Sequence, residues 1–304
     1  MHAKPHAMPE PQSLSLWPSL GDAWESTEGP EAGECAAGAA RWQLLKGEAR
    51  TRVLRLEADG FSPLVLKIYA VPSHLAWRTL GMVSRANREF TAMMEAHRRD
   101  LAVVRPCYRL EERVAGCLRY GALALEALDS VNLEAELDRP ELTADERLRL
   151  ARLTGDLLGN FHRAGLQWAT ATPRNLLLKE EGDEPLRAID MPYATLANTD
   201  ISGSDEALMD LSCILRMSDG RLAFDGMARQ ELMRTYCGGD ESAARTLDEQ
   251  VQLQSHLAWK KQRLRRRVRN LLKPAASSRG AGGSYDASSG SYERLSGGAV
   301  FLPR

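Results

Sequence analysis

The stretch His162-Arg-Ala-Gly165-Leu-Gln-Trp168-Ala-Thr170-Ala-Thr-Pro173-Arg-Asn175-Leu-Leu-Leu178 decides the fold of this chain. It begins at the end of an expected helix, turns through Gly165, and runs through a polar loop into a short apolar strand. Within the loop, Asn175 stands five residues after Thr170. This is the layout of a catalytic loop, which carries reactive groups between a helix and a strand.

The five-residue spacing matches the H-R-D-x-x-x-x-N pattern of kinase catalytic loops, which hold a general base and a metal-binding asparagine. Asn175 stands at the metal position, and Thr170 stands where the aspartate base belongs. A threonine hydroxyl has no useful basicity near pH 7, so it cannot accept a proton as a carboxylate does. The loop therefore predicts a phosphotransferase fold with a degenerate base position and leaves turnover open.

Composition and charge describe an ordinary soluble protein. A chain of 304 residues, 43% hydrophobic and 27% charged, can form one large core or two lobes. Its net charge of −1 predicts no polyanion partner for the molecule as a whole, and its five cysteines lack the C-x-x-C spacing of a zinc site. Because the sequence shows neither an apolar leader nor a long apolar stretch, we expect a cytoplasmic protein. The alternative is a cytoplasmic protein that also contacts the inner face of the cytoplasmic membrane peripherally.

The first half of the folded region is predicted to be a small sheet with one helix. The helix begins at Ser84, a preferred N-cap residue, and lies between the third and fourth of five strands. The expected elements are a strand–turn–strand unit over Arg41–Leu56 with its turn at Lys46-Gly47-Glu48, strands Leu64–Tyr69, Leu101–Leu110 and Gly116–Leu128, and helix Ser84–Arg99.

The second half is predicted to be mostly helical. Its first long helix begins with a capping box, in which Thr143 is followed three residues later by Glu146. The expected elements are helices Thr143–Arg163, Glu206–Arg216, Met227–Tyr236 and Glu241–Leu272, with strands Leu176–Leu178 and Leu186–Ile189 around a Gly182 turn.

This order predicts an α+β, bilobed protein-kinase-like fold, with a small antiparallel-sheet N-lobe and a mostly helical C-lobe. We place the N-lobe at residues 38–128 and the C-lobe at residues 129–273, ending in a basic helix. Residues 1–37, rich in Pro, Gly and Glu, are expected to be a disordered leader, and residues 274–304 a disordered Ser/Gly-rich tail.

Lys67 and Glu89 are the first candidate site residues. Lys67 ends an apolar run in Val-Leu-Lys-Ile, like the strand lysine of V-A-I-K, which contacts nucleotide phosphates. Glu89, on the next helix, is the natural carboxylate to hold its ammonium group. Taken alone, Lys67 is better interpreted as a strand-end lysine that reaches out to water; Glu89 and the catalytic loop downstream shift the balance to the phosphate role.

Two aspartates follow the loop. Asp190 comes fifteen residues after Asn175, behind a strand–turn–strand, where kinases hold the metal-binding aspartate of D-F-G; here Met191 and Pro192 replace the Phe-Gly. Together Asn175 and Asp190 supply the hard oxygen ligands that Mg²⁺ takes beside nucleotide phosphates. Asp210 is expected either to bind the loop backbone or only to stabilise the start of its helix.

Other candidates carry weaker signals. Gly47 alone stands where G-x-G-x-x-G has three glycines to cover the nucleotide, and Glu126, at the end of a strand, is also assigned to nucleotide binding. His162 lies at a helix end, where capping or packing is favoured over catalysis.

These residues resemble the lipopolysaccharide kinase (Kdo/WaaP) family of protein-kinase-like enzymes, over about Arg41 to Lys273. The resemblance rests on short ordered motifs: Leu-Lys67-Ile-Tyr, Ser84-Arg-Ala-Asn-Arg-Glu89-Phe, Pro173-Arg-Asn175-Leu-Leu-Leu, Ile-Asp190, Asp210-Leu and Leu-Met-Arg-Thr-Tyr236-Cys. It implies ATP as phosphate donor, Mg²⁺ or alternatively Mn²⁺ as the ion, and a lipopolysaccharide-core sugar, another sugar or a protein as acceptor. By resemblance, Lys67 and Glu89 hold phosphates, and Asn175 and Asp190 hold the metal.

A basic amphipathic segment follows at residues 259–273, with eight cations and no acid. Such a helix suits an anionic membrane surface, and it suits equally a terminal helix docked on the C-lobe with a solvated cationic face. Nucleic acid is less favoured, because no aromatic platform accompanies the charges. The leading hypothesis is an ATP-dependent phosphotransferase, and the alternative is a pseudokinase, a nucleotide-binding scaffold or regulator without turnover.

Overall fold

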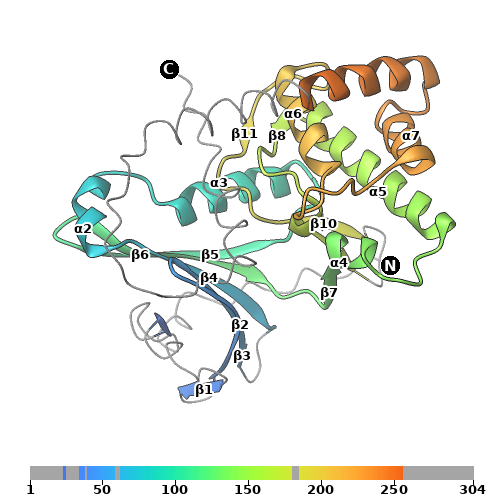
Figure 1. Ribbon diagram of the computed structural model, residues 1–304. Helices are drawn as coiled ribbons and strands as arrows, with labels where there is room; N and C mark the ends of the chain where they lie inside the picture. The colour runs from blue at the N-terminus through green and yellow to red at the C-terminus, as the bar shows by residue number, and fades with distance from the viewer. Residues whose placement is uncertain (1–22, 25–33, 38–39, 59–61, 180–184, 256–304) are drawn as a thin grey trace, which may run out of the picture.

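The computed structural model describes residues 23–24, 34–37, 40–58, 62–179 and 185–255. Figure 1 shows a sheet with helix α3 (Arg85–Arg98) along one face. A separate group of helices at the upper right contains α5 (Ala144–Arg163), α6 (Asp205–Ile214) and α7 (Gly226–Tyr236). We call the sheet with α3 the N-lobe and the helical group the C-lobe. None of the helices in the described residues combines the length and apolar character needed to cross a membrane.

The N-lobe sheet has six antiparallel strands in the order β1-β2-β3-β4-β6-β5. Alternation along β4 sends Leu66 and Ile68 into one core, against β3, while Lys67 and Tyr69 face α3. The strands are β1 (Glu34–Ala37), β2 (Ala40–Glu48), β3 (Thr51–Ala58), β4 (Leu64–Ala70), β5 (Pro106–Val114) and β6 (Cys117–Glu126).

Two predicted strand positions are corrected. The β2–β3 turn lies at residues 49–50, not at Lys46-Gly47-Glu48, because a bulge between Leu44 and Lys46 lets β2 continue to Glu48. Strand β5 begins at Pro106 rather than at Leu101. Residues 101–104 are apolar because they are buried against the C-lobe, where Val103 forms an isolated bridge with Ala188.

No element was predicted for the link between β4 and α3. The link contains α2 (Ser73–Ala76) and the 3-10 turn η2 (Trp77–Thr79). Helix α3 begins as predicted, because the Ser84 hydroxyl accepts a hydrogen bond from the Asn87 backbone. The helix buries Glu89 completely and leaves His97 near its end exposed.

The C-lobe follows the predicted helices closely. The capping box at Thr143 and Glu146 starts α5 as predicted, α6 and α7 follow, and a further helix occupies residues 241–255. The shorter elements are β7 (Ser130–Asn132), α4 (Leu133–Leu137), β8 (Leu166–Gln167), η3 (Pro173–Asn175), β9 (Leu176–Lys179), β10 (Leu186–Ala188) and β11 (Thr195–Leu196).

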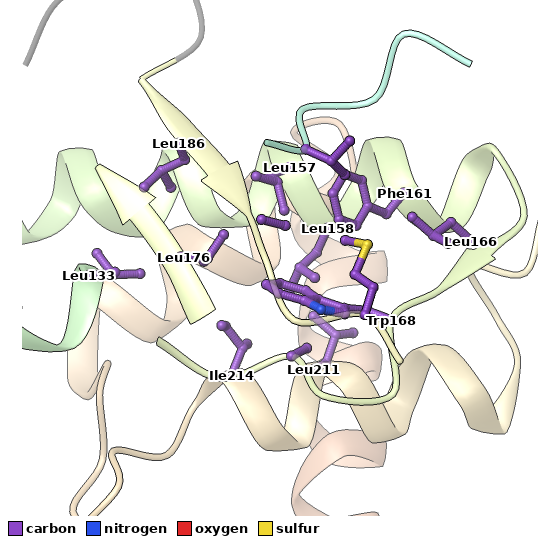
Figure 2. Packing of buried hydrophobic residues seen from close by; sticks show 14 of the residues in the cluster. Leu133, Leu157, Leu158, Phe161, Leu166, Trp168, Leu176, Leu186, Leu211 and Ile214 are labelled. Atoms are coloured by element: carbon purple, nitrogen blue, oxygen red, sulfur yellow. The ribbon is translucent and has the colours of Figure 1, made fainter. Parts of the chain in front are cut away.

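The core of the C-lobe surrounds Trp168, which lies in the predicted catalytic loop. Figure 2 shows its indole between Phe161 of α5 and Leu211 of α6. The Trp168 and Phe161 rings meet edge to face at 6.0 Å, and both side chains are fully buried. Burying two aromatic side chains here anchors the loop to the helices on both sides.

Part of the expected leader is structured. Residues 34–37 form β1 on the edge of the sheet, and Trp24 is buried, with its ring 6.0 Å from that of Tyr120. The rest of the leader, the Gly182 turn, the basic segment 259–273 and the predicted tail lie outside the described residues. The lobe boundaries at 38–128 and 129–273 stay a prediction.

Candidate active site

Lys67 and Glu89 meet on the face of the sheet that α3 covers. The Lys67 Nζ atom lies 3.3 Å from one Glu89 oxygen, and the Tyr69 hydroxyl donates a 2.6 Å hydrogen bond to the other. Glu89 has no solvent exposure. Both oxygens of a buried carboxylate are thus paired, as burial of a charge requires.

Asp190 joins this pair from the C-lobe. Its Oδ1 atom lies 2.6 Å from Lys67 Nζ and 3.3 Å from Arg85 Nη2. The backbone of Asp190 is left-handed, with φ of 61°, which is uncommon for a residue with a side chain. Lys67, Glu89, Asp190 and Arg85 therefore form one charged cluster where the two lobes meet, and we call it the ion cluster.

The charges of the ion cluster support one another. Burial alone would raise the pKa of the Asp190 carboxyl, but the positive charges of Lys67 and Arg85 outweigh it and lower that pKa. Burial alone would lower the pKa of Lys67, but Glu89 and Asp190 raise it. The cluster therefore holds Lys67 as a cation and Asp190 as an anion at neutral pH.

The loop from Trp168 to Asn175 holds the backbone of Asp190. The Thr170 hydroxyl and the Trp168 indole N–H both donate to the Asp190 carbonyl oxygen. The Asn175 side-chain amide donates to the Thr170 carbonyl at 2.9 Å, and the Asn175 carbonyl accepts from the Ile189 backbone. Thr170, Asn175 and Asp190 thus lie together, as the motif spacing predicted.

Asp210 of α6 binds the backbone of the Trp168–Asn175 loop. Its two oxygens accept hydrogen bonds from the backbone N–H groups of Trp168, at 2.6 Å, and Ala169, at 2.8 Å. Asp210 is completely buried, so its role is structural and goes beyond the alternative of stabilising a helix start. His162, also buried, lies between Asp210 and the Tyr236 hydroxyl and packs as expected.

Two predicted nucleotide-binding residues have no contact that joins them to the ion cluster in the described part of the chain. Gly47 lies within β2, opposite Arg52 and beside the turn. Glu126 lies at the end of β6 and pairs with Arg105, at 3.4 Å, and with Arg187. Their assignment to nucleotide binding stays a prediction.

Arg85 and Tyr69 belong to the site and were not predicted from the sequence. The Arg85 guanidinium stacks over the Tyr69 ring at 4.7 Å and faces Tyr193 at 6.0 Å. The signals were present. Tyr69 is two residues after Lys67 on the same strand face, and Arg85 is four residues before Glu89 on the same helix face.

The residues present fit a divalent cation. Asn175 uses its amide nitrogen in the loop, and no described donor bonds its oxygen; the second oxygen of Asp190 is equally free of described donors. One amide and one carboxylate oxygen suit Mg²⁺, which takes few protein ligands when phosphates and water supply the rest. No cluster of three or more His, Cys, Asp or Glu side chains offers a metal site elsewhere in the described residues.

Comparisons with known proteins agree with the geometry. The model of the lipopolysaccharide kinase (Kdo/WaaP) family matches residues 72–236, more than half of the chain. A solved structure, WaaP in complex with acyl carrier protein, is similar with a TM-score of 0.52 and 18% identity, over 82% of this chain and 98% of that one. No curated protein matches the sequence. The structural likeness shows that the chain has a bilobed kinase-like fold, as predicted.

Proposed function

Because the chain belongs to the lipopolysaccharide kinase (Kdo/WaaP) family, we propose that it is an ATP-dependent phosphotransferase to a sugar hydroxyl of the lipopolysaccharide-core type. Membership of a kinase family implies the use of ATP and a divalent metal in general terms. The observation that carries the proposal is the ion cluster, in which Lys67 is held between the carboxylates of Glu89 and Asp190.

Each residue of the site has a role in this proposal. Lys67, positioned by Glu89, would hold nucleotide phosphates, and Arg85 would add a second positive charge beside them. Asn175 and Asp190 would hold Mg²⁺, or alternatively Mn²⁺, which when bound neutralises phosphate charge. Phosphoryl transfer depends mainly on positioning and charge stabilisation, and these residues supply both.

Thr170 has a structural task at the base position. Its hydroxyl hydrogen is directed at the Asp190 carbonyl oxygen, so the group is a donor there and not a proton acceptor. Loss of a general base typically slows a reaction by about a hundred- to ten-thousand-fold. We therefore expect slow turnover, limited by proton removal from the acceptor hydroxyl.

A thermal-shift experiment tests nucleotide binding. Wild-type protein should be stabilised by ATP with Mg²⁺ and less by ATP alone, and Asp190→Ala should lose the difference between the two conditions. Exchanging Mg²⁺ for Mn²⁺ identifies the ion that the site prefers. A wild-type protein whose unfolding temperature is indifferent to ATP and metal would rule out the proposed site.

The alternative is a pseudokinase, and the donor geometry of Thr170 favours it. The discriminating measurement is ATP consumption by wild type, Asp190→Ala and Thr170→Asp proteins, with sugar acceptors. Activity in wild type that Asp190→Ala abolishes would exclude the pseudokinase. Activity that arises only in Thr170→Asp would establish it.

A further inference from the structure

An exposed apolar surface lies at the end of the N-lobe, where the β4–α3 link meets the β5–β6 hairpin. Its members are each more than half exposed, and they are five of the eleven exposed large hydrophobic residues in the described part of the chain. They are Trp77, Leu80, Met82, Val83 and Val114, and we call them the apolar end surface. In Figure 1, the neighbouring α2 lies at the end of the sheet away from α5 and α7.

The backbone beneath this surface is fixed to the sheet. The Arg113 guanidinium of β5 donates to the carbonyls of Met82, at 2.8 Å, and Gly116, at 3.0 Å, and more weakly to that of Thr79. The Thr79 hydroxyl accepts a 2.8 Å hydrogen bond from the Leu118 backbone in β6. The apolar side chains are therefore displayed on a rigid support, and their exposure is not that of a loose loop.

The link segment of this surface carries positive charge, whereas the neighbouring β5–β6 hairpin carries Glu111 and Glu112, each paired with an arginine. Between residues 70 and 94 the only acid is Glu89, which is buried in the ion cluster. Arg78 stacks over the Trp77 ring at 5.3 Å, and Arg88 donates to the Val83 carbonyl. Both arginines are exposed. The chain as a whole has a net charge of −1, so this concentration of positive charge is local.

We propose that the apolar end surface, with Arg78 and Arg88, docks on an anionic lipid bilayer. Tryptophan, aliphatic side chains and arginine are the composition of membrane-interface anchors: the apolar groups enter the interface and the cations stay at the headgroups. The five side chains are exposed at the end of a lobe, and a bilayer accepts exposed apolar side chains without a matching groove.

One member of the surface, Val83, lies close in the chain to a residue of the candidate active site. Val83 is two residues before Arg85, whose guanidinium contacts Asp190, so their Cα atoms are at most about 7 Å apart. A bilayer docked at this end would bring a lipid-anchored acceptor toward the ion cluster. This consequence rests on the proposed function, whereas the docking itself does not.

Vesicle co-sedimentation tests the docking with the full chain. Wild type should bind vesicles of equal parts phosphatidylglycerol and phosphatidylcholine, and bind vesicles of phosphatidylcholine alone more weakly. Trp77→Ser with Leu80→Ser should lower the partition coefficient at least about ten-fold, and Arg78→Gln should lower it about five-fold at low salt. The matched control, Leu222→Ser with Met227→Ser, removes exposed apolar residues elsewhere and should bind as wild type.

Two further readouts separate the outcomes. Tryptophan quenching by brominated lipid should fall in Trp77→Phe while binding persists, and ATP-dependent thermal stabilisation should be unchanged in all these variants. Equal binding by wild type and Trp77→Ser/Leu80→Ser would overturn the proposal, as would loss of all binding on deletion of residues 256–304 alone. Self-association of wild type that the double variant abolishes, without vesicle binding, would assign the surface to a second copy instead.

Discussion

Lys67 Nζ lies 2.6 Å from Asp190 Oδ1, although the two residues are 123 positions apart in the chain. One belongs to the N-lobe sheet and the other to the segment after β10 in the C-lobe. This ion pair joins the lobes at the site itself. On the proposed function, a phosphate–metal complex at this site would share Asp190 with Lys67 and Arg85, and we therefore expect nucleotide binding to be coupled to the contact between the lobes.

Lys67→Met should abolish nucleotide-dependent stabilisation and weaken the fold. The substitution leaves Glu89 buried with only the Tyr69 hydroxyl as partner, and we expect a loss of about 1–3 kcal/mol in unfolding free energy. Urea unfolding with and without ATP and Mg²⁺ measures both effects. Lys46→Met, which removes an exposed lysine paired with Glu48, should change neither.

Thr170→Val should loosen the loop around Asp190. Valine keeps the shape of threonine but removes the hydroxyl that donates to the Asp190 carbonyl, which costs about 1 kcal/mol and should weaken ATP affinity. Thr170→Ser keeps the donor and should retain affinity. Titration of each variant with ATP and Mg²⁺ checks this, and equal affinity for valine and serine would show that the hydroxyl does not support the site.

Asp210→Asn should destabilise the protein by about 2–3 kcal/mol. The two carboxylate oxygens of Asp210 accept hydrogen bonds from the backbone N–H groups of Trp168 and Ala169. Asparagine replaces one of these oxygens with an NH₂ donor, so one buried backbone N–H loses its acceptor. Ser212→Ala, on the same helix, removes local side-chain bonds within α6, chiefly the one to the Met209 carbonyl, and serves as control. If urea unfolding gives the two variants the same stability, the carboxylate is not what holds the loop.

Gly155→Ala and Gly159→Ala should act in opposite directions although both lie in α5. A Cβ at Gly155 would stand 2.4 Å from the Leu232 backbone oxygen of α7, which forces the helices apart and costs about 1–3 kcal/mol. A Cβ at Gly159 meets only the end of the flexible Arg163 side chain, so the gain in helix propensity, up to about 1 kcal/mol, should prevail. Thermal unfolding of the pair measures the contrast.

Glu146 should make stability depend on pH in the acid range. Hydrogen bonds from the Thr143 backbone and hydroxyl and from Arg139 lower the pKa of Glu146 to about 2, against roughly 4.3 in the unfolded chain. Its stabilising contribution is therefore complete above about pH 4.3 and is lost as pH falls toward 2. Urea unfolding at several pH values should show wild type more stable than Glu146→Gln near neutrality and the two converging in acid; a difference independent of pH would contradict the assignment.

Local signals in the sequence predicted most of the elements and the order of the site residues. Ser84, Thr143 and Glu146 cap their helices as expected, because capping involves residues within one turn of each other. The spacing of Thr170, Asn175 and Asp190 predicted their proximity, since a loop and a tight strand pair leave little freedom over that distance.

The tertiary structure decided what depends on contacts between distant segments. Residues 101–104 read as a strand by hydrophobicity, yet they are apolar because the C-lobe covers them. Gly155 lies inside α5, and only the packed structure shows that the α7 backbone leaves no room for a Cβ there.

The sequence by itself determined a kinase-like chain with Lys67, Glu89, Asn175 and Asp190 in order and Thr170 at the base position. Only the tertiary structure brought Arg85 to Asp190, turned the Thr170 hydroxyl toward a carbonyl and gathered the apolar end surface. Pattern and spacing act along the chain, whereas the partner of a charge or the exposure of a side chain depends on which distant segments pack beside it.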